Sequence, residues 1–132
     1  MSTPVYMSHE HIEQMNDLLA RSDEVAAACA ELDRDYVIAY ELGDGPGGTV
    51  FWVLSFDRIT GARFSLDEPA HADVTFAGDW RRLVRAGQAH RQGTEVDPAV
   101  EVRGDPGVLD AVSPAMAVAR RAATVDVEFP EV

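Results

Sequence analysis

The middle of the sequence holds short runs in which large apolar residues recur at every second position, and this period limits the folds that the chain can adopt. Between residues 36 and 76, apolar side chains recur at every second position in four stretches. That period is typical of strands with one buried face. The stretches are 36–42, 49–57, 62–66 and 72–76. Because turn-like segments separate the first three, we predict an antiparallel meander followed by a fourth strand.

Helical spacing flanks the predicted strands. Ser8 is a predicted N-cap for a first helix, and Ser22 begins a second helical stretch that ends near Leu32. The two stretches fit either one continuous helix or a kinked one. After the strands we expect a helix over 80–87, a fifth strand over 99–103 and a helix from 105. The pair Ser113-Pro114 repeats a start signal and predicts a separate last helix.

This order of elements predicts one α+β domain with a single, mainly antiparallel, five-stranded sheet covered on one face by helices. The length of 132 residues suits one domain, and no repeat or linker divides the chain. We expect an N-terminal helical region over 1–34, a core over 35–122 and a tail over 123–132. Residues 124–129 alternate in polarity, so they fit either an extra strand or an ordered tail.

The charge of the chain excludes several classes of function. Its formal net charge is -12, from 23 acidic and 11 basic residues, so its average surface repels nucleic acid. We expect no nucleic-acid partner. All the basic residues are arginine, which excludes a Schiff-base lysine and a phosphate-loop lysine. Cys29 is the only cysteine, and we interpret it as a buried apolar side chain.

Targeting signals are not visible in the sequence. No apolar run approaches the ~20 residues that a membrane span needs, and residues 1–7 lack the charged and apolar segments of a secretory signal. We therefore expect a cytoplasmic protein with no integral membrane association.

Two short motifs suggest a cofactor or a metal site, but their contexts do not fit. Gly43, Gly45 and Gly48 match the spacing G-x-G-x-x-G, yet a strand follows where a dinucleotide site needs a helix. His9 and His11 are two residues apart, so they point to different sides of a helix. We predict no metal site, no cofactor and no catalytic residue, and we interpret this first turn as exposed and polar.

Arginines are concentrated on the predicted helix that follows the fourth strand. Arg81, Arg82 and Arg85 lie within five residues, and Arg91 follows. They fit either a solvated face or contacts to the acidic head of an amphipathic ligand, because a guanidinium binds carboxylate or phosphate through two hydrogen bonds. We take Arg82 and Arg85 as the candidate head-group contacts.

A set of large apolar residues on the strands and later helices is the main candidate for a binding site. As a closed core it needs no further function, but a gap between one sheet and few helices would bind apolar molecules. The set comprises Trp52, Phe56, Phe64, Phe76, Trp80, Leu83, Leu109, Val112 and Met116.

Several segments in series resemble the sterol carrier protein type of lipid-binding domain. The loop 44–48 with Trp52-Val53-Leu54 resembles its second-strand signature, and 72–76 resembles its a-D-x-T strand. The helix 80–87 and the segment 100–105, similar to v-x-v-x-G-D, follow in the same order. This resemblance implies a hydrophobic tunnel between sheet and helices, and it adds Leu54 and Val84 to the residues that would line it.

The chain departs from that family pattern in three places. Asp97-Pro98 lies later than the family's Asp/Asn-Pro, next to the fifth strand. The N-terminal helical region and the tail lie outside the matching part. Either of them is a candidate to plug the tunnel or to form a homodimer interface.

We therefore expect binding or transfer of a hydrophobic small molecule, such as a lipid, a fatty acyl chain, a sterol-like molecule or a bacterial secondary metabolite. One alternative is a cofactor-independent enzyme that uses the same pocket, with Tyr36, His90 or a carboxylate as acid or base. Another is a closed domain that serves only in protein assembly.

Overall fold

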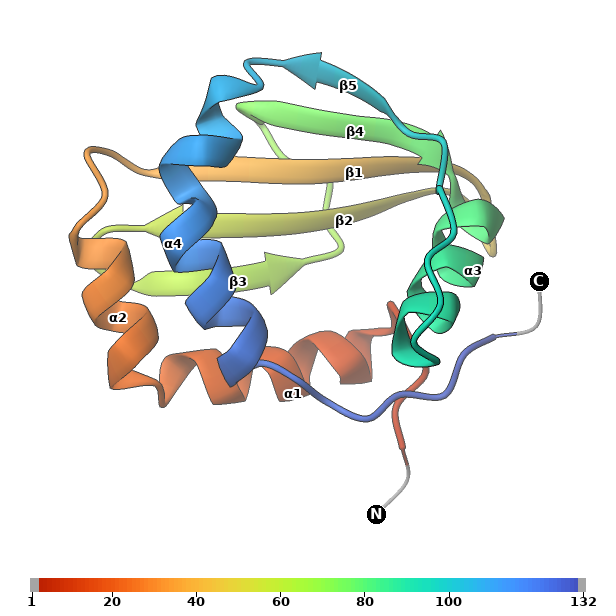
Figure 1. The fold of residues 1–132 in the computed structure, drawn as a ribbon, viewed down its shortest axis with the longest axis horizontal. Coiled ribbons are helices and arrows are strands. Elements are labelled where there is room, and N and C mark those ends of the chain that lie inside the picture. Colours follow the sequence, from red (N-terminus) through yellow and green to blue (C-terminus); the bar gives the residue numbers. More distant parts are fainter. Residues whose placement is uncertain (1–2, 131–132) are drawn as a thin grey trace.

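The computed structural model describes residues 3–130 and shows one mixed five-stranded sheet with four helices (Figure 1). The strand order is β3-β2-β1-β4-β5. The elements are α1 (His9–Ala20), α2 (Asp23–Ala30), β1 (Tyr36–Gly45), β2 (Gly48–Asp57), β3 (Gly61–Ser65), β4 (Val74–Asp79), α3 (Trp80–Arg91), β5 (Glu101–Gly104) and α4 (Gly107–Ala122). The α+β class and the five strands predicted from the sequence are confirmed.

The sheet is mainly antiparallel, as predicted, with one parallel pair. The pairs β1–β2, β2–β3 and β4–β5 are antiparallel, whereas β1–β4 is parallel. Because β3 and β4 run in the same direction, the chain between them must return along the sheet. Residues 66–73 make this return behind the sheet in Figure 1. The other face is thereby left to the helices.

The register of the strands places the alternating apolar residues on the face covered by the helices. Ile38 lies opposite Leu54, and Tyr40 lies opposite both Trp52 on β2 and Phe76 on β4. Since side chains directly opposite each other share a face, all five belong to one apolar layer.

The helices cover this layer unevenly and form two apolar clusters. The larger cluster joins α1, α2 and α4 to the sheet, with Val25, Phe56 and Val112 at its centre. The smaller one lies under α3 and includes Leu42 and Val84. In Figure 1, α4 and α3 lie over opposite ends of the strands. The middle of the sheet therefore receives little cover.

The first two helical stretches are separate helices that begin at the predicted serine N-caps. Two other predicted helix boundaries were wrong, each for a local reason. α3 extends beyond Gly87 to Arg91, because Gly87 does not end the helix but packs against Tyr6. α4 continues through Pro114, so no new helix begins there. Pro114 is exposed while Val112, Ala115 and Ala119 are buried, and packing of that buried side outweighs the one hydrogen bond lost.

The strand boundaries also differ in places from the prediction. β1 continues through the glycine-rich segment to Gly45, which pairs with Gly48 across a two-residue turn, so the expected six-residue loop is mostly strand. The fourth and fifth strands lie later than predicted. The alternating residues 124–129 form no strand of the sheet. Instead, Glu128 exchanges backbone hydrogen bonds with Pro4 and Tyr6, which holds the two terminal segments side by side.

The predicted division into 1–34, 35–122 and 123–132 stays a prediction. Residues 1–2 of the first region and 131–132 of the tail lie outside the described part of the chain.

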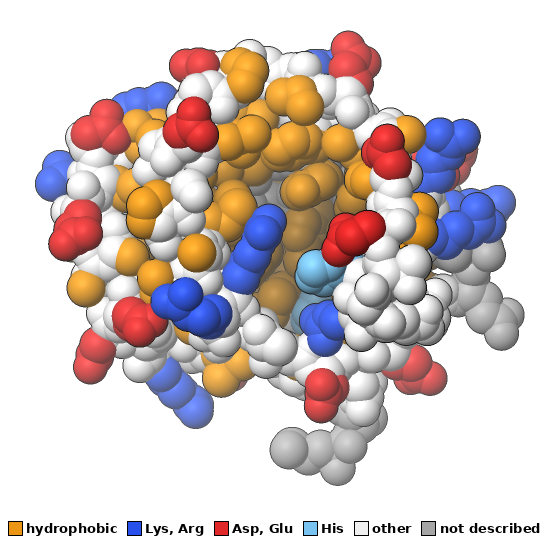
Figure 2. Space-filling model, viewed as in Figure 1, with side chains coloured by type: hydrophobic (Ala, Val, Ile, Leu, Met, Phe, Trp, Pro, Cys, Tyr) orange, Lys and Arg blue, Asp and Glu red, His pale blue; other side chains and the backbone are white. Residues whose placement is uncertain are grey.

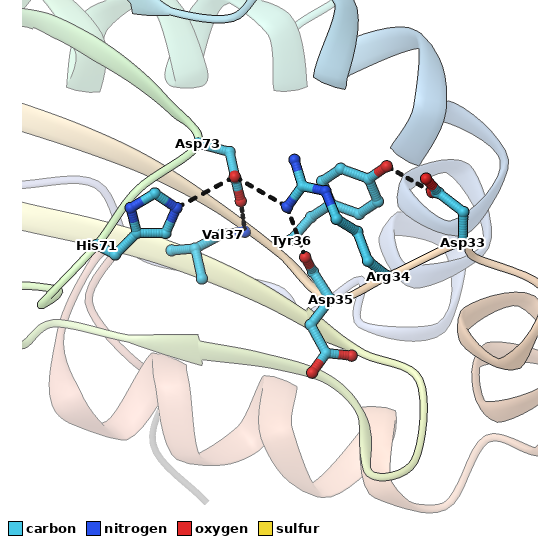
Figure 3. A network of polar contacts seen from close by, with 7 residues as sticks. All are labelled: Asp33, Arg34, Asp35, Tyr36, Val37, His71 and Asp73. Atoms are coloured by element: carbon cyan, nitrogen blue, oxygen red, sulfur yellow. Dashed lines mark hydrogen bonds and ion pairs between the residues drawn. The ribbon is translucent and has the colours of Figure 1, made fainter.

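The carboxylate of Asp73 holds the parallel pair of strands together at one end (Figure 3). Its Oδ2 accepts a hydrogen bond of 2.8 Å from the Val37 N–H on β1. Its Oδ1 is 3.0 Å from the Arg34 guanidinium and 3.2 Å from the His71 ring. Burial disfavours the charged carboxylate, but these three donors outweigh it and lower the pKa of Asp73 below its usual value. Asp73 therefore remains charged and fully hydrogen-bonded at neutral pH.

Candidate ligand-binding site

A hollow lined with apolar side chains opens between α4 and α3 on the helix-covered face (Figure 2). Its base is the middle of the sheet, where Tyr40, Trp52 and Phe76 are only half-buried although they point toward the helices. Leu83 from α3 and Met116 from α4 are also half-buried. Large apolar side chains left partly uncovered in a concave surface are typical of sites for apolar ligands.

Aromatic stacking makes the base of the hollow rigid. The rings of Tyr40 and Phe76 are stacked, with centroids 4.9 Å apart and planes inclined by 23°. Trp52 lies 5.3 Å from Phe64 and 5.5 Å from His11, measured between centroids. Trp52 also packs against both apolar clusters. Its indole therefore lies at their junction, where the helical cover is thinnest.

The residues predicted to line a tunnel fall into two groups. Six are half-buried and keep surface for a ligand: Trp52, Phe64, Phe76, Leu83, Leu109 and Met116. The other five are buried in the two clusters and support the first group from behind: Leu54, Phe56, Trp80, Val84 and Val112. The structure thus places the predicted set between the sheet and the helices, in two clusters, and contact with a ligand stays a prediction.

Two arginines outside the pair chosen from the sequence affect the pKa values of aromatic side chains and of His11 near the hollow. Arg82 and Arg85 are exposed on α3, and their role as head-group contacts stays a prediction. Arg91 instead acts electrostatically on Tyr6 and His11, and Arg120 acts on Tyr40. Helical spacing would have found both, since Arg120 is four residues after Met116 and Arg91 is seven after Val84. Arg91 was missed because the helix was predicted to end at Gly87.

His11 is buried beside the hollow, and the prediction of an exposed first turn was wrong for this residue. Its side chain is 2% exposed, and its Nδ1 accepts a hydrogen bond of 3.1 Å from the Met7 N–H. Met7 has a φ of 65°, a strained conformation for a side chain of this size, which the bond to His11 helps to hold. Burial, assisted by the charge of Arg91, lowers the pKa of His11 to about 4. The ring is therefore neutral at pH 7.

Acidification is expected to destabilise the protein through His11. The pKa of this imidazole falls from 6.5 to about 4 on folding, so between these values the unfolded chain binds more protons than the folded one. The stabilisation is complete above the unfolded pKa and is lost as the pH falls through this range, by about 3 kcal/mol in total.

Urea unfolding of the natural protein and of His11→Asn at pH 7 and pH 4.5 measures this effect. Asparagine offers an oxygen to the Met7 N–H but does not titrate. We expect the loss of unfolding free energy on acidification to be smaller in the variant by about 2 kcal/mol. An equal loss in both proteins would show that His11 does not titrate as a buried neutral group.

Two depressions lie near the tip of the β1–β2 hairpin. One has a volume of about 370 Å³ and lies between residues 5–8 and the hairpin. The other, of about 800 Å³, is lined by glycines and by polar residues that include Asp79 and Arg81. Both are open to solvent, and neither includes the stacked aromatic residues of the sheet.

Residues 3–130 contain no helix that is both long and apolar enough to span a membrane. Within the same range, no three histidine, cysteine or acidic side chains are grouped as metal ligands. Cys29 is buried, as predicted, and burial raises the pKa of its thiol.

The arrangement of sheet and helices matches a known fold. A crystal structure of sterol carrier protein 2 superposes with a TM-score of 0.54 over 92% of this chain and 99% of that one, at 19% sequence identity. The chain has the sterol carrier protein 2 fold. The resemblance noted in the sequence is thereby confirmed at the level of the fold.

Two other solved structures show weaker similarity. A protein described as UbiJ-SCP2 ubiquinone synthesis protein gives a TM-score of 0.48 at 21% identity, over 83% of this chain and 88% of that one. The sterol carrier protein domain 2 of Helicoverpa armigera gives 0.45 at 18% identity, over 97% and 100%. No protein-family model matches the chain. No curated protein matches it either.

Proposed function

We propose that this protein binds or carries a hydrophobic small molecule in the hollow between α3 and α4. The observation that carries the proposal is the half-buried aromatic base of Tyr40, Trp52 and Phe76, which faces the helices but is only partly covered by them. A soluble domain would ordinarily cover such a layer with its own side chains. A bound apolar molecule would complete that cover.

Burial of apolar surface is sufficient to drive such binding. At about 25 cal/mol per Å², removing roughly 300 Å² of ligand surface from water contributes about 7 kcal/mol before the cost of association. The stacked base is rigid before binding, so little side-chain order has to be gained when the ligand enters. No covalent chemistry or metal is needed.

The fold supports the same proposal. The solved protein whose fold this chain shares is described as a sterol carrier protein. By contrast, the side chains considered for an enzyme lie apart from the base of the hollow. Tyr36 donates a hydrogen bond to Asp33 at the end of the sheet, and His90 is exposed and bonded to Glu95. These positions favour carriage over catalysis.

Filling the hollow is expected to abolish most of the binding. N-phenyl-1-naphthylamine, an uncharged apolar probe whose fluorescence rises in apolar surroundings, should bind the natural protein saturably. Met116→Trp adds bulk to a half-buried position on α4 and should weaken the affinity at least tenfold, equivalent to about 1.4 kcal/mol.

Ile59→Trp is the matched control, since Ile59 is 94% exposed in the β2–β3 turn and should leave the affinity unchanged. Native mass spectrometry of the purified protein would in addition reveal a retained ligand. Absence of saturable probe binding, or equal weakening by both substitutions, would overturn the proposal.

A further inference from the structure

The two edges of the sheet differ in how they are covered. At the β3 edge, the side-chain amide of Asn16 on α1 donates a hydrogen bond of 3.0 Å to the Phe64 carbonyl and accepts one of 2.7 Å from the Phe64 N–H. These bonds take the place of those that a neighbouring strand would make. At the other edge, the backbone of β5 bonds only to β4 among the described residues, and no described element lies beyond it in Figure 1. β5 is therefore the open edge of the sheet, where a further strand can pair.

The side chains of β5 divide between the two faces of the sheet. Val102 lies opposite Phe76 on β4, so it points toward the helix-covered face, and it is 46% exposed. Glu101 and Arg103 point to the other face and are both exposed. The Arg103 guanidinium lies 3.5 Å from the carboxylates of Glu101 and Glu41. The open edge thus carries one apolar side chain between two opposite charges.

This order of side chains is complementary to itself in one antiparallel register. When a two-fold axis relates two identical antiparallel strands, one residue lies opposite its own copy and its neighbours lie opposite each other's copies. With Val102 on the axis, Glu101 of each copy lies opposite Arg103 of the other. An axis at Glu101 or at Arg103 would instead place like charges directly opposite, which is destabilising. Charge therefore selects the register centred on Val102.

We propose that two copies of this protein associate through β5, antiparallel and with Val102 on the two-fold axis. The two Val102 side chains pack together on the helix-covered face, and two Glu101–Arg103 pairs form on the other face. The two five-stranded sheets become one continuous sheet, with both hollows open on the same side. Because Asn16 covers the β3 edge, association stops at two copies and does not continue into a fibre. This inference goes beyond the proposed function and does not depend on it.

The expected dimer is weak and reversible. A strand of four residues makes a small interface, so we expect a dissociation constant in the micromolar range. The net charge of -12 on each copy opposes association. Salt weakens this repulsion, since charges on the two surfaces are screened over a Debye length of about 8 Å at physiological ionic strength.

Sedimentation velocity at pH 7 and physiological salt, over about 10 to 500 μM protein, tests the association. The sedimentation coefficient of the natural protein should rise with concentration toward that of a dimer. Glu101→Arg and Arg103→Glu should each weaken association at least tenfold, because both cross-strand pairs change from attraction to repulsion. Both positions are exposed, so the variants should fold as the natural protein does, which circular dichroism checks.

An equimolar mixture of the two variants tests the register. In a mixed pair, the two arginines on β5 of one copy lie opposite the two glutamates on β5 of the other, so association should return to about the natural strength. The mixed dimer has the same total charge as the natural one, and the recovery therefore reports local pairing. Arg63→Glu is the matched control, because Arg63 is exposed on β3 and the substitution makes the same change of charge at the covered edge. It should weaken association less than twofold.

Three results would overturn the inference. The first is a natural protein that stays monomeric over the whole concentration range. The second is a mixture that associates no better than its two components, since the register centred on Val102 requires the recovery. The third is equal weakening by Arg63→Glu and Arg103→Glu, which would show an effect of net charge alone.

Discussion

Replacing Phe56 with alanine is expected to lower the free energy of unfolding by about 3–5 kcal/mol. Phe56 is 1% exposed, lies opposite Tyr36 on β1 and Ala62 on β3, and belongs to the larger apolar cluster. Truncation removes a large buried ring and leaves a cavity that the paired strands cannot close. Since a domain of this size has only about 5–15 kcal/mol of stability, this loss would approach its limit.

Urea unfolding followed by tryptophan fluorescence and by circular dichroism measures the loss. Phe56→Leu keeps most of the volume and should cost considerably less than alanine. Ile59→Ala, only three residues away but 94% exposed, should change the free energy by no more than about 0.5 kcal/mol. A cost below about 1 kcal/mol for Phe56→Ala would contradict the burial of this ring between sheet and helices.

Replacing Asp73 with alanine is expected to cost about 3 kcal/mol of unfolding free energy. The substitution removes the acceptor of the Val37 N–H and the partner of Arg34 and His71 together. The side chain of Asp73 is only 9% exposed, so water replaces these bonds poorly. The backbone hydrogen bonds of Asp73 with Val37 and Asp105 do not depend on the side chain and should remain.

Asp73→Asn separates the hydrogen bond from the charge. Asparagine keeps an oxygen for the Val37 N–H, so it should cost less than alanine. The pKa of Asp73 is lowered on folding, so its contribution is present above the ordinary value of 3.8 and is lost as the pH falls through the folded value. Unfolding measured at pH 7 and pH 3 should show a smaller difference between natural protein and Asp73→Asn at the lower pH. Equal differences would contradict a charged Asp73 in the folded state.

The strands were predictable because each has one buried face, so that its large apolar residues recur at every second position. The pairing of β1 with β2 and of β2 with β3 follows from short connections. The parallel pairing of β4 with β1 does not, since alternation identifies the buried face of a strand but not its neighbour.

Helix ends were predicted less well, because the same residue type has different effects in different surroundings. Gly87 predicted the end of a helix, but it lies where α3 passes close to Tyr6, so that an added Cβ would be 3.0 Å from the Tyr6 hydroxyl. Pro114 was taken as a start, but it occupies the exposed side of a helix that is held by its buried side.

By itself, the sequence determined the α+β class, the buried face of each strand and the inward direction of Trp52 and Phe76, because periodicity within one element determines which side chains are buried. The uncovered middle of the sheet was decided only when α3 and α4 packed over opposite ends of the strands. The polar groups around it depend on the same tertiary packing. Tyr6 and His11 near the N-terminus, Tyr40 on β1, Arg91 on α3 and Arg120 on α4 belong to separate elements that only tertiary packing brings together.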